Sequence, residues 1–177
     1  RPHTSHSRKM LLLEGCVQPG MLPNINSATA RVLDALKIQL ISAPNATCCG
    51  ALRHHLNDQV GGLENAKQNI DAWWPQVEQG VEAIVMTASG CGVMVKDYGH
   101  LLSNDPQYAV KAKTISALTK DISEILPVLQ EELVALVGSD PKPGVVYHPP
   151  CTLQHGQQIR GKVAVSYTHL RAHETLM

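Results

Sequence analysis

Short apolar runs alternate with amphipathic stretches along the chain, and this alternation predicts an α/β fold. The run Lys9–Leu13 is apolar without a break from Met10 and stops at Glu14-Gly15. A strand of this kind is buried on both faces, as in a parallel sheet covered by helices. Similar runs predict parallel strands over residues 9–13, 38–42, 83–87 and 144–148.

The stretches between these runs carry apolar residues at helical spacing. They predict helices over about 26–37, 63–79, 93–102, 104–118 and 121–137, with a helical turn at 51–59. Gly61-Gly62 should interrupt the chain before the second helix, and Pro75 should kink or split that helix. The predicted fold class is therefore α/β, a parallel sheet flanked by helices.

Composition limits the class of partner. The chain has 177 residues, enough for one domain, and its 15 Lys+Arg balance its 15 Asp+Glu. A nucleic-acid partner would favour a basic surface, so none is expected. No apolar run approaches the roughly 20 residues of a membrane span. Arg1–Ser5 is polar and no initiator Met is present, so we expect no signal peptide and a chain that begins inside a longer protein.

Four cysteines follow the first three predicted strands. Cys16 comes after the first, Cys48 and Cys49 after the second, and Cys91 after the third. The carboxyl ends of parallel strands share one edge of a sheet, where sites in α/β proteins collect. The adjacent thiols of Cys48-Cys49 can reach one object only in an irregular loop, and Gly50 lets the backbone turn or approach closely.

The spacing leaves several interpretations of this group open. A local zinc ribbon is excluded, because it uses closely spaced cysteine pairs, whereas 31 residues separate Cys16 from Cys48. Four thiolates can hold a [4Fe–4S] cluster, with sulfurs expected within about 4–7 Å of one another. Four unrelated core cysteines, a structural zinc site with four thiolate ligands and a redox-active Cys48/Cys49 disulfide remain as alternatives. His54 and His55 are close in sequence and are either solvated or possible iron ligands.

The pattern of Cys16, Cys48-Cys49-Gly50 and Cys91 resembles the CCG, or cysteine-rich, domain. That domain occurs in heterodisulfide reductases, lactate-utilisation proteins and glycolate oxidase. The strings LEGCVQP, NIDAWWP, TASGCG and CTLQH narrow the resemblance to the iron–sulfur subunits of glycolate oxidase (glycolate dehydrogenase) over about residues 8–163.

The resemblance implies a division of the chain. Residues 1–8 would be a linker, 9–140 a first, Rossmann-like CCG domain, and 141–163 the beginning of a truncated second repeat that includes Cys151. The implied metal ligands are Cys16, Cys48, Cys49 and Cys91. Heterodisulfide reductase has C-x-x-C at the last element, whereas Met94 stands here, which favours four ligands and an ordinary [4Fe–4S] cluster or an incomplete site.

The resemblance also implies a function. The chain would be a non-catalytic electron-transfer part of an oxidoreductase, with no catalytic residue of its own. Flavin-containing subunits would oxidise glycolate to glyoxylate, and electrons would pass through this subunit toward a membrane quinone. Its location would be cytoplasmic, at the inner face of the plasma membrane through the complex. The alternative is a structural or assembly module with a four-cysteine zinc site or no metal.

The end of the chain differs from the rest. Residues 164–177 resemble the translation of a transposase-type sequencing adapter and are expected to be a non-native tail. We accordingly predict that residues 165–177 pack against nothing.

Overall fold

A parallel sheet lies at the centre of the molecule. The structure is a computed structural model that describes residues 5–137 and 146–171. Within these residues the sheet has four strands in the order β2-β1-β3-β4, all parallel. They are β1 (Arg8–Leu12), β2 (Ile38–Ser42), β3 (Ile84–Met86) and β4 (Thr119–Asp121). The predicted fold class is confirmed.

Helices connect the strands and continue beyond the last one. In chain order the helices of the first part are α1 (Gln18–Met21), α2 (Pro23–Ala35), α3 (Ala51–His55), α4 (Gln59–Glu78), α5 (Ser89–Leu101) and α6 (Ala109–Leu118). After β4 come α7 (Ile122–Ile125), the 3₁₀ turn η1 (Leu126–Leu129), α8 (Gln130–Val137), the π-helical η2 (Thr152–Gly156) and α9 (Lys162–Arg171).

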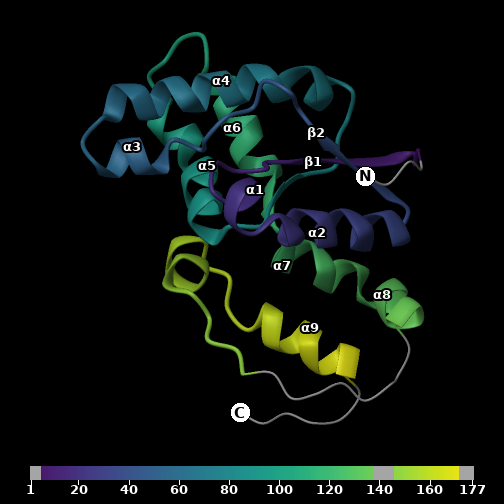
Figure 1. Cartoon of the computed structure of the whole chain (residues 1–177). Coiled ribbons are helices and arrows are strands. Elements are labelled where there is room, and N and C mark those ends of the chain that lie inside the picture. The colour runs from purple at the N-terminus through teal and green to yellow at the C-terminus, as the bar shows by residue number, and fades with distance from the viewer. Residues whose placement is uncertain (1–4, 138–145, 172–177) are drawn as a thin grey trace.

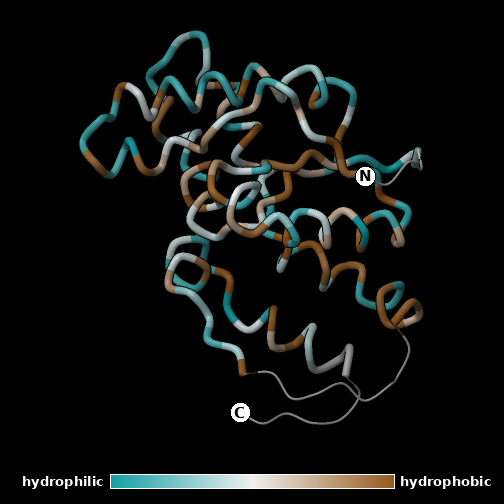
Figure 2. Tube along the Cα trace, in the orientation of Figure 1, coloured by the Kyte–Doolittle hydropathy of each residue, from teal (hydrophilic) through white to brown (hydrophobic). Residues whose placement is uncertain are grey.

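The sheet is covered on both faces, which explains why β1 and the residue after it are apolar without a break from Met10 to Leu13. Leu11 and Leu13 point to one face and pack with α4, α5 and α6, whereas Met10 and Leu12 point to the other and pack with α2 and the helices after β4. Figure 1 shows these two layers on either side of β1, and Figure 2 shows the hydrophobic run of β1 between them. Side chains alternate along a strand, so a strand between two layers needs apolar residues at every position.

Three predicted strands are confirmed, and the fourth is wrong. Residues 144–145 lie outside the described residues, and 146–148 are not a strand. The fourth strand of the sheet is β4, which pairs with β3 from Ile84↔Thr119 to Met86↔Asp121. With three residues and the exposed Lys120 in the middle, β4 has no apolar run that a pattern search would detect.

The glycine pair Gly61-Gly62 does not interrupt the chain but lies in the first turn of α4, whose N-cap is Asp58. Both glycines are buried, and a Cβ at Gly62 would lie 3.1 Å from the Cβ of His54 and 3.3 Å from the carbonyl oxygen of Gly50. The absent side chains therefore let α3 and the loop before it approach α4 closely. Pro75 also fails to split α4, which continues to Glu78.

The last described helix contradicts the prediction that residues 165–177 pack against nothing. Residues 165–171 continue α9, which contacts α7, η1 and α8. The side-chain oxygen of Ser166 is buried, so this part of the segment has packing partners. Residues 172–177 lie outside the described residues. None of the helices in the described ranges has the length and apolar character needed to cross a membrane.

Candidate metal centre

Four cysteines meet at the carboxyl edge of the sheet, although three separate segments carry them. Cys16 follows β1, Cys48 and Cys49 lie in the irregular loop after β2, and Cys91 lies in the first turn of α5, after β3. Cys91 was expected in a turn before a helix from residue 93, but α5 begins at Ser89. The convergence agrees with the sequence-based prediction and follows from parallel strands, whose carboxyl ends share an edge.

The four thiols form two pairs. The sulfurs of Cys16 and Cys48 are 3.5 Å apart, slightly closer than expected, at the exposed side of the site. On the inner side the buried Cys49 interacts with Cys91. Cys49 also interacts with the thiol of Cys48, so the two pairs are in contact with each other, and all four cysteines are free thiols.

The thiols influence one another's ionisation. Hydrogen bonding from Cys49 lowers the pKa of Cys91, although burial acts in the opposite direction. The same hydrogen bond, together with burial, raises the pKa of Cys49 far above its ordinary value. Burial, with the neighbouring thiol of Cys48, also raises the pKa of Cys16. Four thiolates so close together repel one another unless a positive group lies among them, so the donor set fits a cationic metal group.

Four thiolates can hold either a single zinc ion or an iron–sulfur cluster. Tetrahedral zinc with Zn–S bonds of about 2.3 Å holds all four sulfurs within about 4 Å of each other. The 3.5 Å between the sulfurs of Cys16 and Cys48 lies within that spread. Among the described residues, however, no group of three or more His, Cys, Asp or Glu side chains already has the spacing of a single-ion site. An iron–sulfur cluster places each thiolate on a different iron and therefore accepts a wider spread.

Other candidates from the sequence have different roles. Met94 is 4% exposed and packs in the apolar core beside Cys49, so its thioether serves packing. Lys96, which follows Cys91 on α5 and carries a positive charge, forms an ion pair with Glu124 at 2.6 Å. The rings of His54 and His55 contact each other edge-to-face, with centroids 5.8 Å apart.

The segment after Cys151 docks beside the site. Cys151 is exposed and immediately precedes η2, which packs against α5. The side chain of Gln157 donates to the carbonyl oxygen of Ser89 at 2.9 Å and to Asp121 at 3.3 Å. The first turn of α5, which carries Cys91, is thereby covered by residues assigned from the sequence to a second repeat.

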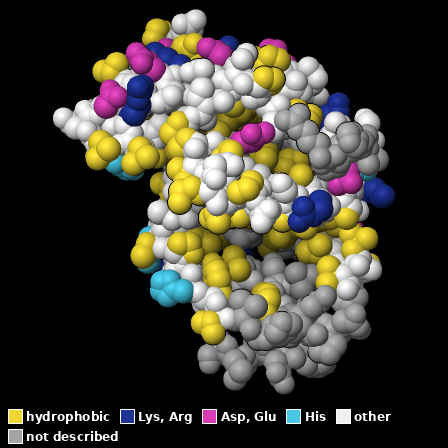
Figure 3. Space-filling model, viewed as in Figure 1, with side chains coloured by type: hydrophobic (Ala, Val, Ile, Leu, Met, Phe, Trp, Pro, Cys, Tyr) yellow, Lys and Arg dark blue, Asp and Glu magenta, His cyan; other side chains and the backbone are white. Residues whose placement is uncertain are grey.

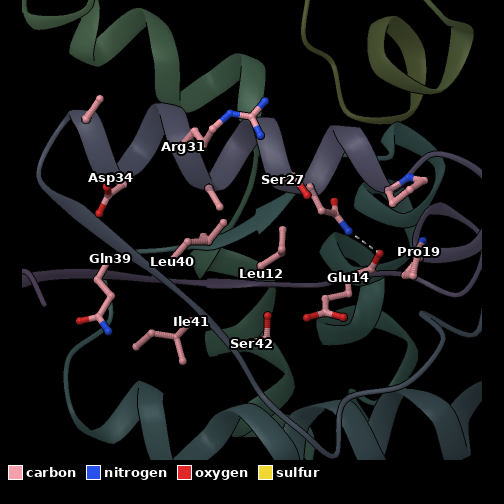
Figure 4. A pocket seen from close by; sticks show the side chains of 14 residues that line it. Leu12, Glu14, Pro19, Ser27, Arg31, Asp34, Gln39, Leu40, Ile41 and Ser42 are labelled. Atoms are coloured by element: carbon pink, nitrogen blue, oxygen red, sulfur yellow. Dashed lines mark hydrogen bonds between the residues drawn. The ribbon is translucent and has the colours of Figure 1, made fainter. Parts of the chain in front are cut away.

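Two hollows lie near this edge of the sheet. One, of about 590 Å³, is lined in part by Gly15, Cys16, Thr47 and Cys48 and so lies beside the pair of Cys16 and Cys48. A larger groove of about 880 Å³ lies between α2 and β2 and is shown in Figure 4. Its lining contains no cysteine, so its size does not make it the metal centre.

Exposed apolar side chains follow Cys16 in the chain. Val17, Met21 and Leu22, from α1 and the residues on either side of it, are 52%, 75% and 58% exposed. Figure 3 shows hydrophobic side chains gathered over α1 and α2, with most charged groups toward the periphery of that face. Clustered exposed apolar groups are typical of surfaces that contact other proteins.

Two polar residues near the cysteines have no counterpart in the sequence-based prediction. Asn69 of α4 and Tyr98 of α5 are fully buried and hydrogen bond to the backbone of the Cys48-Cys49 loop. The sequence signal that could have indicated Asn69 is its position among apolar residues on one face of α4. A buried amide needs hydrogen-bond partners, so an Asn at such a position points to a polar contact inside the core.

Comparison with known proteins agrees with this fold and site. The profile of the cysteine-rich domain family, CCG, matches residues 10–96, which include all four cysteines. Through these residues the chain belongs to the CCG family. No solved structure matches the chain significantly.

Among curated proteins, the chain is 52% identical over 163 residues to the glycolate oxidase iron-sulfur subunit of Escherichia coli (strain K12), covering 92% of this chain and 39% of that protein. It is 31% identical to the probable glycolate oxidase iron-sulfur subunit of Bacillus subtilis (strain 168), covering 84% of this chain and 32% of that protein. Lactate utilization protein A of Bacillus pumilus (strain SAFR-032) is 27% identical, over 81% of this chain and 57% of that protein. The chain thus spans about a third to three-fifths of the length of these relatives.

Proposed function

We propose that this chain is part of the iron–sulfur subunit of a glycolate oxidase and that Cys16, Cys48, Cys49 and Cys91 hold a [4Fe–4S] cluster. The observation that carries the proposal is the convergence of these four cysteines from three segments at one edge of the sheet. The 52% identity to the Escherichia coli subunit supports the choice of family.

The role of the chain in this proposal is electron transfer rather than catalysis. Oxidation of glycolate to glyoxylate releases two electrons and two protons, which flavin-containing subunits of the complex accept. A bound cluster supplies a one-electron redox centre through which electrons pass toward a membrane quinone. The residues of this chain hold that centre, shield its inner side in the apolar core, and leave its outer side at Cys16 open to a partner.

The surface around Cys16 supports contact with other subunits. The exposed Val17 directly follows Cys16, and the exposed Met21 and Leu22 end the short helix α1 that comes after it, on the segment that a redox partner would approach. In this arrangement the complex is cytoplasmic and lies at the inner face of the plasma membrane, close to the quinone.

Anaerobic purification with iron, acid-labile sulfide and zinc analysis tests the proposal. The chain should contain about four iron atoms and about four sulfides and show the broad visible absorption of a cluster. Cys49→Ser and Cys16→Ser should lower iron content and weaken that absorption. Cys151→Ser is the control matched to Cys16→Ser, since both side chains are exposed, and it should change neither.

The same analysis separates the proposal from a structural or assembly module. One zinc per chain without sulfide, or a folded chain indifferent to Cys16→Ser and Cys49→Ser, would overturn the cluster assignment in favour of that module.

A further inference from the structure

The loop that carries Cys48 and Cys49 lacks the usual partners of backbone groups. Residues 46–49 belong to no helix or strand. They nevertheless lie against the apolar core formed by α4 and α5, where Cys49 is only 3% exposed. Buried N–H and C=O groups need partners, and where a loop leaves the regular bonds of helix and strand, side chains are one source of them.

Asn69 supplies partners on one side of the loop. Its side chain is fully buried on α4. The Oδ1 atom accepts from the N–H of Thr47 at 2.6 Å, and Nδ2 donates to the carbonyl oxygen of Cys48 at 2.9 Å. A single amide therefore pairs a donor and an acceptor of the loop, which an apolar side chain or a carboxylate could not do.

Tyr98 extends this network from the next helix. Its hydroxyl accepts from Nδ2 of Asn69 at 3.2 Å and donates to the carbonyl oxygen of Cys49 at 2.8 Å. Tyr98 is also fully buried. The donors and acceptors follow one direction from Asn69 through Tyr98 to Cys49, so every bond in the chain can form at once.

We propose that Asn69 and Tyr98 are positioning residues of the metal centre: they fix the backbone of the Cys48-Cys49 loop so that one sulfur faces Cys16 and the other faces Cys91. This inference rests on the proposed function. Neither side chain contacts a sulfur in a described hydrogen bond. Both act through the loop backbone: the N–H of Thr47 and the carbonyl groups of Cys48 and Cys49. The nearby residues Ala66, Ile70 and Val95 are apolar and fully buried. Among the described residues, the one other side-chain bond to these carbonyl groups is the longer bond from the Thr47 hydroxyl to Cys48, at 3.4 Å.

The experiment compares Tyr98→Phe with Tyr108→Phe in the whole chain. Both variants lose one tyrosine hydroxyl and keep the ring, but the hydroxyl of Tyr108 donates to Asp71 at the exposed surface. Loss of an outer partner of a metal ligand typically lowers metal affinity about tenfold or more. Tyr98→Phe should therefore release iron at about tenfold lower chelator concentration and change the visible circular dichroism and the midpoint potential, whereas Tyr108→Phe should match the wild type.

A folded Tyr98→Phe chain that keeps wild-type iron retention, dichroism and potential would overturn the positioning role. Failure of the proposed function would look different, since the wild-type chain itself would take up no iron and sulfide. In that case, amide hydrogen exchange of the metal-free chain tests whether Tyr98 fixes the cysteine loop. Tyr98→Phe should raise exchange at residues 47–50 about tenfold, the effect of losing about one hydrogen bond, and leave α6 unchanged. Unchanged exchange in the loop would refute the inference without reference to any cluster.

Discussion

Replacement of Gly50 by alanine should destabilise the chain more than any comparable glycine substitution outside the site. Gly50 has φ +87°, in the left-handed region, and an added Cβ would lie 2.6 Å from the carbonyl oxygen of Gly62. The left-handed conformation costs an L-residue about 1–2 kcal/mol. The Cβ also approaches Asn65 at 3.3 Å, so forced separation of α3 and α4 adds about 1–3 kcal/mol, as overpacking does.

Gly80→Ala separates these two contributions. Gly80 has φ +82°, but a Cβ there meets nothing within 4 Å. It should therefore lose only about 1–2 kcal/mol through its backbone conformation, against about 2–5 kcal/mol for Gly50→Ala from conformation and clash together. The larger figure is a substantial part of the roughly 5–15 kcal/mol typical of a domain.

Urea unfolding of the metal-free variants, followed by the fluorescence of the buried Trp73, measures both losses. The reasoning is refuted if Gly50→Ala unfolds at the same urea concentration as Gly80→Ala. Equal losses would mean that the loop after Cys49 relaxes away from α4 without cost, and that the close approach at Gly62 does not hold the cysteine loop in place.

Two further predictions concern contacts around α5. Burial, the largest single influence, would raise the pKa of Glu124. The hydrogen bonds from Lys96 and from the backbone N–H of Asp121, together with the positive charges of Lys96 and Lys120, outweigh burial and lower this pKa below its ordinary 4.5. The stabilising contribution of the Glu124 carboxylate is therefore complete above about pH 4.5, and it is lost as the pH falls through the lowered pKa of the folded chain. Between pH 6 and pH 3, the urea midpoint should therefore fall less steeply for Glu124→Gln than for the wild type. A steeper or equal fall would contradict the ion pair. Gln157→Ala removes the hydrogen bonds to Ser89 and Asp121 and should lower the free energy of unfolding by about 1–3 kcal/mol. Protease cleavage after residue 151 should become faster in this variant, and a rate as slow as in the wild type would argue against the docking of this segment on α5.

The strands that the sequence predicts correctly share one physical property. Residues 9–13, 38–42 and 83–87 contain consecutive apolar side chains because these strands lie between two helical layers. The strand β4 was missed because its middle residue, Lys120, is exposed and its three residues form no periodic pattern. The residues predicted to pack against nothing were misjudged for a related reason. Whether a helix such as α9 finds a surface depends on the neighbours it meets, which local composition does not record.

For the metal centre, the sequence by itself determined that cysteines follow three parallel strands, and the topology of such strands was enough to bring them to one edge. Only the tertiary structure decided that Cys48 faces Cys16 while Cys49 faces Cys91, and that Asn69 and Tyr98 hold the loop between them. An apolar strand followed by a cysteine is a local pattern, and it repeats along the chain. The pairing of adjacent thiols depends instead on how α4 and α5 pack behind the loop, because hydrogen bonds require distances that only the packed helices set.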